Sequence, residues 1–193
     1  LADRLQQAMA QSDRRGQKVL IAYLDLDNFK QVNDQYGHAM GDQLLQALGH
    51  RLKDHLRDGD TLARIGGDEF VAVLTDFAEM ASALSIINRL IGSAGDVFRL
   101  DGANLQISTS IGLTSYPQDT PIDADQLLRQ ADQAMYQAKL AGRNRYHFFD
   151  PEQDRNLRGH HESIDQIRQA LQAGQFVLHY QPRVNLQTGA VIG

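Results

Sequence analysis

Longer segments with apolar residues at helical spacing alternate with short apolar runs along this chain. Apolar side chains recur every three or four residues over Gly41–Leu56, Glu79–Ile91 and Ala124–Ala141, which predicts amphipathic helices there. A thinner apolar stripe predicts a polar helix over Leu1–Arg15. The polar stretch Asn33–His38 predicts a loop.

The short apolar runs predict strands. Val19–Leu24 is continuously apolar, as in a strand buried on both faces, and Gly66-Gly67-Asp68-Glu69 is a turn between two apolar runs. The expected strands are Val19–Leu24, Thr61–Ile65, Phe70–Leu74, Val97–Leu100, Leu105–Thr114 and Tyr146–Phe149. The order β-α-β-β-α-β-β-α-β indicates an α+β fold, a ferredoxin-like or polymerase-palm-like sheet with helices packed on it.

The pattern weakens after Asp150-Pro151. Residues 151–163 are rich in charge and poor in apolar side chains, which is typical of a linker. Residues 164–193 then predict a helix and a hairpin, too little to close a second core. We therefore expect one domain over residues 1–150, a linker, and the incomplete beginning of another domain.

Composition narrows the classes of function. The 193 residues carry a net charge of −5 and no cysteine, which excludes disulfides and thiolate metal sites and disfavours nucleic-acid binding. The longest apolar run, Val19–Leu24, is too short to span a bilayer, and no signal peptide precedes it. We expect a cytoplasmic domain whose parent protein is tethered, if at all, through a region before Leu1.

Acidic residues mark two turns. Asp25 and Asp27 follow a buried strand, and Asp68 and Glu69 lie on a hairpin. In a palm-like sheet these places can adjoin, and three or four carboxylates together need a cation, for which Mg²⁺ is suited. The alternative is that Asp25–Asn28 and the hairpin tip are only turn chemistry.

Six blocks together resemble the GGDEF family of diguanylate cyclases, over about Leu1–Phe149. They are Asp25–Lys30, Asn33–Asp34, Tyr36–His38, Gly41–Asp42, Ala63–Phe70 and Ala138–Asn144. The resemblance implies a reaction that joins two GTP molecules into cyclic di-GMP and releases two pyrophosphates.

The resemblance implies roles around the acidic turns. Asp25, the carbonyl of Leu26 and Asp68 would bind Mg²⁺ (or Mn²⁺). Glu69 would be a further ligand or would help to deprotonate the 3′-hydroxyl, and which of Asp68 and Glu69 is the base stays open. Lys30 would stabilise charge at the α-phosphate.

The resemblance also implies a nucleotide site. Asn33 and Asp42 would read the guanine edge. Adenine would leave a buried acceptor of this site unpaired, and the site would therefore favour guanine. Backbone amides near Asn28 and Phe29 would meet the phosphates. His38 either contacts the nucleotide or is structural.

Two further cations lie near the end of the last long helix. Lys139 and Arg143 are four residues apart, which predicts that they share a helix face. They either complement the helix dipole or bind the triphosphate, and the resemblance favours phosphate binding.

Arg57-Asp-Gly-Asp60 matches the Arg-x-x-Asp signature of the family's inhibitory site. The resemblance implies that cyclic di-GMP binds at Arg57 and Asp60. By itself such a pair is usually a solvated ion pair. Arg89, on the following predicted helix, either supplies a second cation there or is an ordinary surface arginine.

Two such domains must meet, because each holds one GTP. We expect a transient homodimer and low activity unless the protein is concentrated.

Residues from about Ile167 onwards resemble the start of an EAL-type cyclic di-GMP phosphodiesterase domain, without its catalytic acids, or form an ordinary extension. Two alternatives remain open, a GTP-sensing module that regulates an attached phosphodiesterase and another palm-type nucleotidyl cyclase or polymerase.

Overall fold

The computed structural model describes residues 1–77 and 79–151. Leu1–Asp150 form one compact unit, separate from Pro151–Gly193. The expected EAL-type beginning, and the expected linker after Pro151, lie outside the described residues. Among the residues described, no helix is long and apolar enough to cross a membrane.

A five-stranded sheet organises the unit, in the order β2-β3-β1-β6-β7. The central strand β1 pairs antiparallel with β3 and β6, whereas β6 and β7 are parallel. The strands are β1 (Lys18–Asp27), β2 (Thr61–Gly66), β3 (Glu69–Phe77), β6 (Ser108–Tyr116) and β7 (Tyr146–Phe148). The central place of β1 explains why its apolar run is continuous, since both of its faces are covered.

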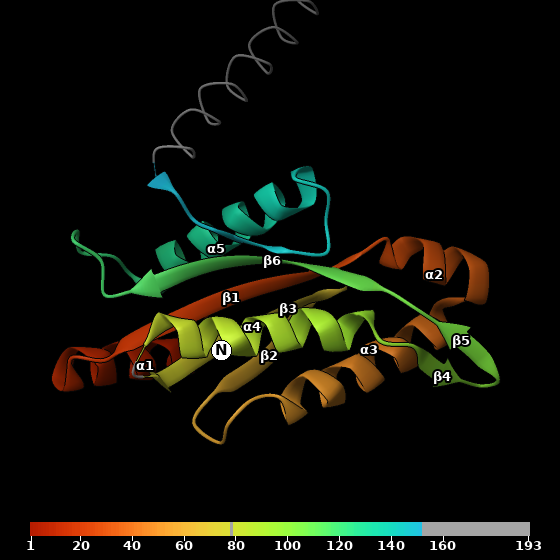
Figure 1. Ribbon diagram of the computed structural model, residues 1–193, viewed down its shortest axis with the longest axis horizontal. Coiled ribbons are helices and arrows are strands. Elements are labelled where there is room, and N and C mark those ends of the chain that lie inside the picture. The colour runs from red at the N-terminus through yellow and green to blue at the C-terminus, as the bar shows by residue number, and fades with distance from the viewer. Residues whose placement is uncertain (78, 152–193) are drawn as a thin grey trace, which may run out of the picture. The chain divides into compact units, whose positions relative to one another are not determined.

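Helices cover both faces of this sheet (Figure 1). On one face, Leu20, Ala22 and Leu24 of β1 join a core with residues of α3 (His38–Asp54) and α4 (Met80–Gly95). On the other face, alternate β1 residues join residues of α1 (Ala2–Arg15) and α5 (Ala124–Leu140). The predicted α+β class is therefore confirmed.

Helix α5 lies unusually close to the sheet. A Cβ atom added to Gly112 of β6 would stand 1.8 Å from the Ala131 carbonyl oxygen and 2.1 Å from the Met135 nitrogen. At its start, Asp123 and Gln126 form a reciprocal capping box. The cap and the close approach fix where α5 runs, and so where its last turn meets the sheet.

Two expectations about local structure are wrong. The polar stretch predicted as a loop belongs largely to a helix, α2 (Phe29–Tyr36), which is held by the buried Phe29 and exposes its polar side. Gly37, at φ 84°, then separates α2 from α3. Most of the polar positions face solvent on a short helix, so they gave no periodic apolar signal.

The strand predicted over Leu105–Thr114 is divided between two sheets. Strands β4 (Phe98–Leu100) and β5 (Ala103–Leu105) form a small sheet of their own, and β6 begins only at Ser108. Between them, the side-chain amide of Gln106 donates to the carbonyl of Gly95 at 2.9 Å. This contact ties the connection to the end of α4, so β5 and β6 are separate strands.

Candidate active site

The end of β1 and the tip of the β2–β3 hairpin are adjacent. Asp25 pairs with Glu69 across the two strands, and the backbone amide of Leu26 donates to the carbonyl of Asp68 at 3.3 Å. Gly67, at φ 39°, makes the turn. The tertiary structure therefore brings Asp25 and Leu26 together with Asp68 and Glu69, which lie more than 40 residues further along the sequence.

Asp25 is the most buried of these carboxylates, with 8% of its surface exposed. Burial raises its pKa, and the nearby charges of Asp68 and Glu69 raise it further. The ammonium group of Lys139 opposes this shift, since its Nζ lies 2.7 Å from Asp25 Oδ1. Asp25 is thus a carboxylate whose charge requires a cation beside it.

The carboxylates of this site can be compared with the ligands that a magnesium ion usually takes. In the described part of the chain, no three His, Asp or Glu side chains are grouped closely enough to enclose a metal. Mg²⁺ does not need such a cage, because it usually binds one or two carboxylates and completes its shell with water and phosphate. Asp25, with Asp68 within electrostatic range, fits that requirement.

Asp27 has a structural role, contrary to its expected place among the clustered carboxylates. It is 4% exposed, and its two oxygens accept from the hydroxyls of Ser108 at 2.6 Å and Ser110 at 2.7 Å. The Asn144 backbone amide also donates to it, at 3.1 Å. Asp27 therefore joins β1, β6 and the loop after α5, and has few free lone pairs for a metal.

The two residues expected to read guanine lie at the contact of α2 with α3. Asn33 is half-buried in α2, and its amide lies against Gly41 in the first turn of α3. Asp42 follows Gly41 directly and is exposed. The Asn33 amide therefore lies beside Gly41, the residue that directly precedes Asp42 in α3.

The remaining nucleotide candidates flank that contact. Asn28, at φ 60°, turns the chain from β1 into α2, where Phe29 is buried and Lys30 is exposed. His38 is exposed at the start of α3. Asn28, Phe29 and Lys30 directly follow the end of β1, and no described contact joins Lys30 or His38 to the acidic residues.

The prediction that Lys139 and Arg143 share a helix face is wrong. Helix α5 ends at Leu140, and Arg143 lies beyond it with φ 61°, its backbone amide donating to the Ala138 carbonyl at 3.0 Å. Lys139 points to Asp25, whereas Arg143 is exposed. Lys139 therefore belongs to the last turn of the helix, whereas Arg143 belongs to the turn that follows it.

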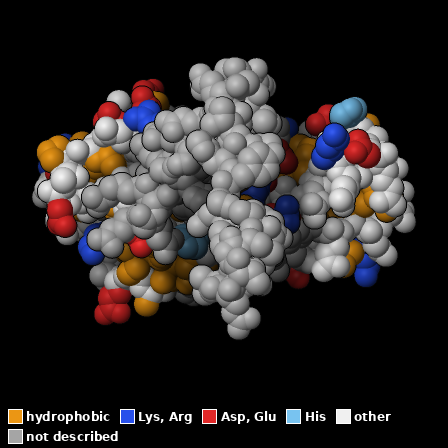
Figure 2. Space-filling view, turned by 90° about the horizontal axis from the view of Figure 1, so that it is seen from above, with side chains coloured by type: hydrophobic (Ala, Val, Ile, Leu, Met, Phe, Trp, Pro, Cys, Tyr) orange, Lys and Arg blue, Asp and Glu red, His pale blue; other side chains and the backbone are white. Residues whose placement is uncertain are grey.

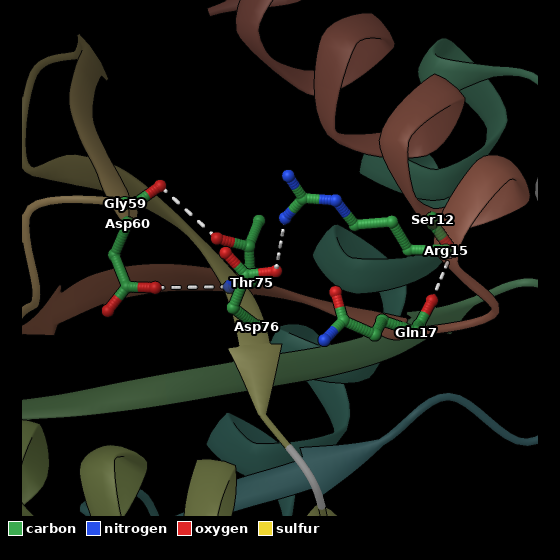
Figure 3. Close-up of polar contacts among 7 residues, drawn as sticks. All are labelled: Ser12, Arg15, Gln17, Gly59, Asp60, Thr75 and Asp76. Carbon is green, nitrogen blue, oxygen red and sulfur yellow. Dashed lines mark hydrogen bonds and ion pairs between the residues drawn. The ribbon is translucent and has the colours of Figure 1, made fainter.

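The Arg-x-x-Asp segment forms a tight loop before β2 (Figure 3). The Asp60 carboxylate accepts from the backbone amides of Arg57 and Thr75, both at 3.0 Å. The Thr75 hydroxyl donates to the Gly59 carbonyl at 3.2 Å. Asp60 thus fixes the loop, and the Arg57 side chain is exposed beside a cleft of about 1110 Å³ that both residues line.

Arg89 has a partner outside that loop. Its guanidinium donates to the carbonyl of His55 at 3.4 Å, which links α4 to the end of α3. Arg89 does not line the cleft of Arg57 and Asp60. A role for Arg89 beside them stays a prediction.

Sequence reasoning missed Tyr23 and Asp132. Burial raises the pKa of Tyr23, and the carboxylates of Glu69, Asp132 and Asp25 add to the shift. Burial also raises the pKa of Asp132, which Lys139 opposes. The spacing of these residues could have indicated both. Tyr23 and Asp25 are two apart on a strand, and Asp132 and Lys139 are seven apart on a helix, so each pair shares one face of its element.

The comparisons with known proteins identify the family of this chain. The family described as "Diguanylate cyclase, GGDEF domain" matches residues 1–145. The bifunctional diguanylate cyclase/cyclic di-GMP phosphodiesterase MucR of Pseudomonas aeruginosa is 40% identical over 193 residues, which are 100% of this chain and 28% of that protein. Diguanylate cyclase TpbB of the same species is 39% identical over 143 residues, 72% of this chain and 32% of its own length.

Solved structures show the same fold. The GGDEF domain of TpbB superimposes with a TM-score of 0.77 at 35% identity, covering 81% of this chain and 91% of that one. The active GGEEF domain of a diguanylate cyclase from Vibrio cholerae gives a TM-score of 0.70 at 29% identity, covering 78% and 94%.

The fold is therefore the palm-like sheet of nucleotidyl cyclases. The chain belongs to the GGDEF family of diguanylate cyclase domains. It spans less than a third of the length of the curated relatives MucR and TpbB, at 28% and 32%.

Proposed function

We propose that this domain is a magnesium-dependent diguanylate cyclase that condenses two GTP molecules into cyclic di-GMP. The observation that carries the proposal is the pairing of Asp25 with Glu69 across β1 and β3, beside Asp68 and Lys139. Carboxylates and a cation at one sheet edge suit a reaction in which a hydroxyl is deprotonated and a pyrophosphate departs.

In the reaction, the 3′-oxygen of each GTP attacks the α-phosphorus of the other. The 3′-hydroxyl proton is lost, the bond to the β-phosphate oxygen breaks, and pyrophosphate leaves. Two such steps form the two phosphodiester bonds of the ring. The chemistry needs no oxidant or reductant.

The acidic residues would bind the metal and assist the attack of the 3′-hydroxyl. Asp25, Asp68 and the Leu26 carbonyl would hold Mg²⁺ or Mn²⁺, which when bound polarises phosphate and hydroxyl oxygens. Glu69 would complete the ligand set or accept the 3′-hydroxyl proton. Lys30 would offset charge at the α-phosphate.

Other residues would bind the nucleotide. Asn33 and Asp42 would pair with the guanine edge, and the backbone near Asn28 and Phe29 would meet the phosphates. Lys139 and Arg143 would neutralise the triphosphate, which a chain of net charge −5 otherwise repels. His38 would lie beside the nucleotide at the start of α3.

Two domains must meet for this reaction, because each would hold one GTP. We propose a transient antiparallel homodimer, in which each copy presents its nucleotide to the other. Product would then inhibit by binding at Arg57 and Asp60. The cleft beside these residues supports this role, as does a solved GGDEF domain of DgcB from Caulobacter crescentus in complex with c-di-GMP.

The setting of the domain follows from these assignments. GTP as substrate would place the domain in the cytoplasm. Where Figure 2 leaves the face visible, acidic and basic side chains are interspersed, which fits a nucleotide enzyme better than a nucleic-acid binder.

The match to MucR across the whole chain supports an EAL-type domain after residue 163.

A second function is favoured by other relatives. The cyclic di-GMP phosphodiesterases NbdA of Pseudomonas aeruginosa and PdeR of Escherichia coli are 38% and 36% identical to this chain. In such a protein this domain would bind GTP and regulate an attached phosphodiesterase without turning GTP over.

Incubation with GTP and Mg²⁺, followed by chromatography, separates the two functions. We expect cyclic di-GMP and pyrophosphate at high protein concentration, and loss of both in Glu69→Ala with GTP binding retained. Intact GTP together with tight GTP binding would establish the regulatory function instead. Turnover strictly proportional to enzyme concentration down to nanomolar levels would contradict the transient dimer.

A further inference from the structure

Gly41 touches the amide of Asn33. The residue is buried in the first turn of α3, and a Cβ atom added to it would stand 2.0 Å from Asn33 Oδ1 and 3.1 Å from Asn33 Cγ. The same atom would stand 3.1 Å from Cζ of the buried Phe29 ring. Real Cβ contacts do not reach 2.0 Å, so any side chain at Gly41 must displace the Asn33 amide.

The backbone does not explain a glycine at this position. Gly37, four residues earlier, has φ 84° and makes the turn between α2 and α3. Gly41 is not among the positive-φ residues and lies inside α3, where alanine is favoured over glycine by about 1 kcal/mol. What the missing side chain provides is therefore room for Asn33.

We propose that Gly41 determines nucleotide specificity by positioning the Asn33 carboxamide beside Asp42. This proposal rests on the proposed function, in which Asn33 and Asp42 read guanine. The contact fixes the amide from α2 against the start of α3, so that both polar groups present one preformed edge to the base. A preformed edge discriminates well, because the wrong base leaves its polar groups unpaired.

The chain supplies matched controls for glycine-to-alanine substitution in a helix. Gly92 lies in α4, and a Cβ atom there would have nothing within 4 Å. Gly49 lies in α3 itself, and its added Cβ would meet only Phe70 Cε1, at an ordinary 3.6 Å. Gly92→Ala and Gly49→Ala thus report the effect of helix propensity alone.

The test is the binding of non-hydrolysable GTP and ATP analogues to the whole chain, measured by calorimetry with Mg²⁺. We expect Gly41→Ala to lower the GTP-to-ATP affinity ratio about tenfold or more, chiefly through weaker GTP binding. Gly92→Ala and Gly49→Ala should leave the ratio unchanged. In Asn33→Ala, which already lacks the amide, adding Gly41→Ala should change the ratio little further.

A second readout follows the amide without nucleotide. In ¹⁵N-labelled protein, the Asn33 side-chain NH₂ signals should move in Gly41→Ala and stay in place in Gly92→Ala. Unmoved signals, or an unchanged affinity ratio in a folded Gly41→Ala protein, would overturn the role of Gly41. If the unmodified protein does not prefer GTP to ATP, the proposed function fails instead, and the NH₂ signals still test the contact.

Discussion

The ammonium group of Lys139 lies 2.7 Å from the carboxylate of Asp25, which joins the last turn of α5 to the end of β1. Asp25 is buried, and Asp68 and Glu69 add their negative charge to its surroundings. The same carboxylate is the central metal ligand of the proposed function. Lys139 and a metal ion would therefore compete for the same negative charge, and the predictions on Asp25 and Lys139 below concern that charge.

Asn at position 25 should stabilise the fold near neutral pH. Because the folded-state pKa of Asp25 is raised, its ionisation costs stability as pH rises from the unfolded value of about 3.9 through the folded value. We expect Asp25→Asn to melt a few degrees higher than the unmodified protein at about pH 7, and at a similar temperature at about pH 3. Thermal melts across this pH range measure both.

The same variant should lose its response to metal. Mg²⁺ should raise the melting temperature of the unmodified protein and leave that of Asp25→Asn unchanged. An Asp25→Asn protein that melts no higher than the unmodified protein at neutral pH would show that the buried charge of Asp25 does not cost stability.

Lys139→Met should separate the two partners of Asp25. Without the ammonium group, nucleotide-free protein should bind Mn²⁺ more tightly, by about tenfold, because a charge-assisted contact no longer competes. GTP binding should weaken in the same variant, since a phosphate-binding cation is lost. Electron paramagnetic resonance of free Mn²⁺ and calorimetry with a GTP analogue measure the two effects; unchanged Mn²⁺ binding would contradict the competition.

Asp27→Ala should destabilise the domain. Its carboxylate accepts from Ser108, Ser110 and the Asn144 backbone, and these donors, of which Ser110 is buried, would lose their partner. We expect a loss of about 2–4 kcal/mol in the free energy of unfolding by urea. Asp34→Ala, at an exposed position, should stay within about 0.5 kcal/mol; an equal loss in both variants would contradict the structural role of Asp27.

Arg51→Met should loosen the connection between α3 and the end of α4. The guanidinium donates to the carbonyls of Ser93, Asp96 and Val97 and lies 3.6 Å from the centroid of the Phe98 ring. We expect a loss of about 2 kcal/mol in unfolding free energy. The exposed Arg99 supplies the control, because Arg99→Ala should change stability little.

The sequence was informative where a local pattern has a local cause. The helices over Gly41–Leu56 and Ala124–Ala141 and the strand at Val19–Leu24 were predicted because their apolar spacing reflects burial on one face or on both. It failed for α2, whose polar face hides the helical period, and for Arg143, where the chain leaves the helix in a left-handed turn.

By itself the sequence determined the type of fold, the family resemblance and the residues of chemical interest, because each is encoded in short motifs and periodic spacing. Only the tertiary structure decided which of them act together. Lys139 meets Asp25 because α5 packs closely on Gly112, and Asn33 meets Gly41 because two helices touch there. Such contacts depend on how one element packs against another, and the apolar pattern within a single element does not carry that information.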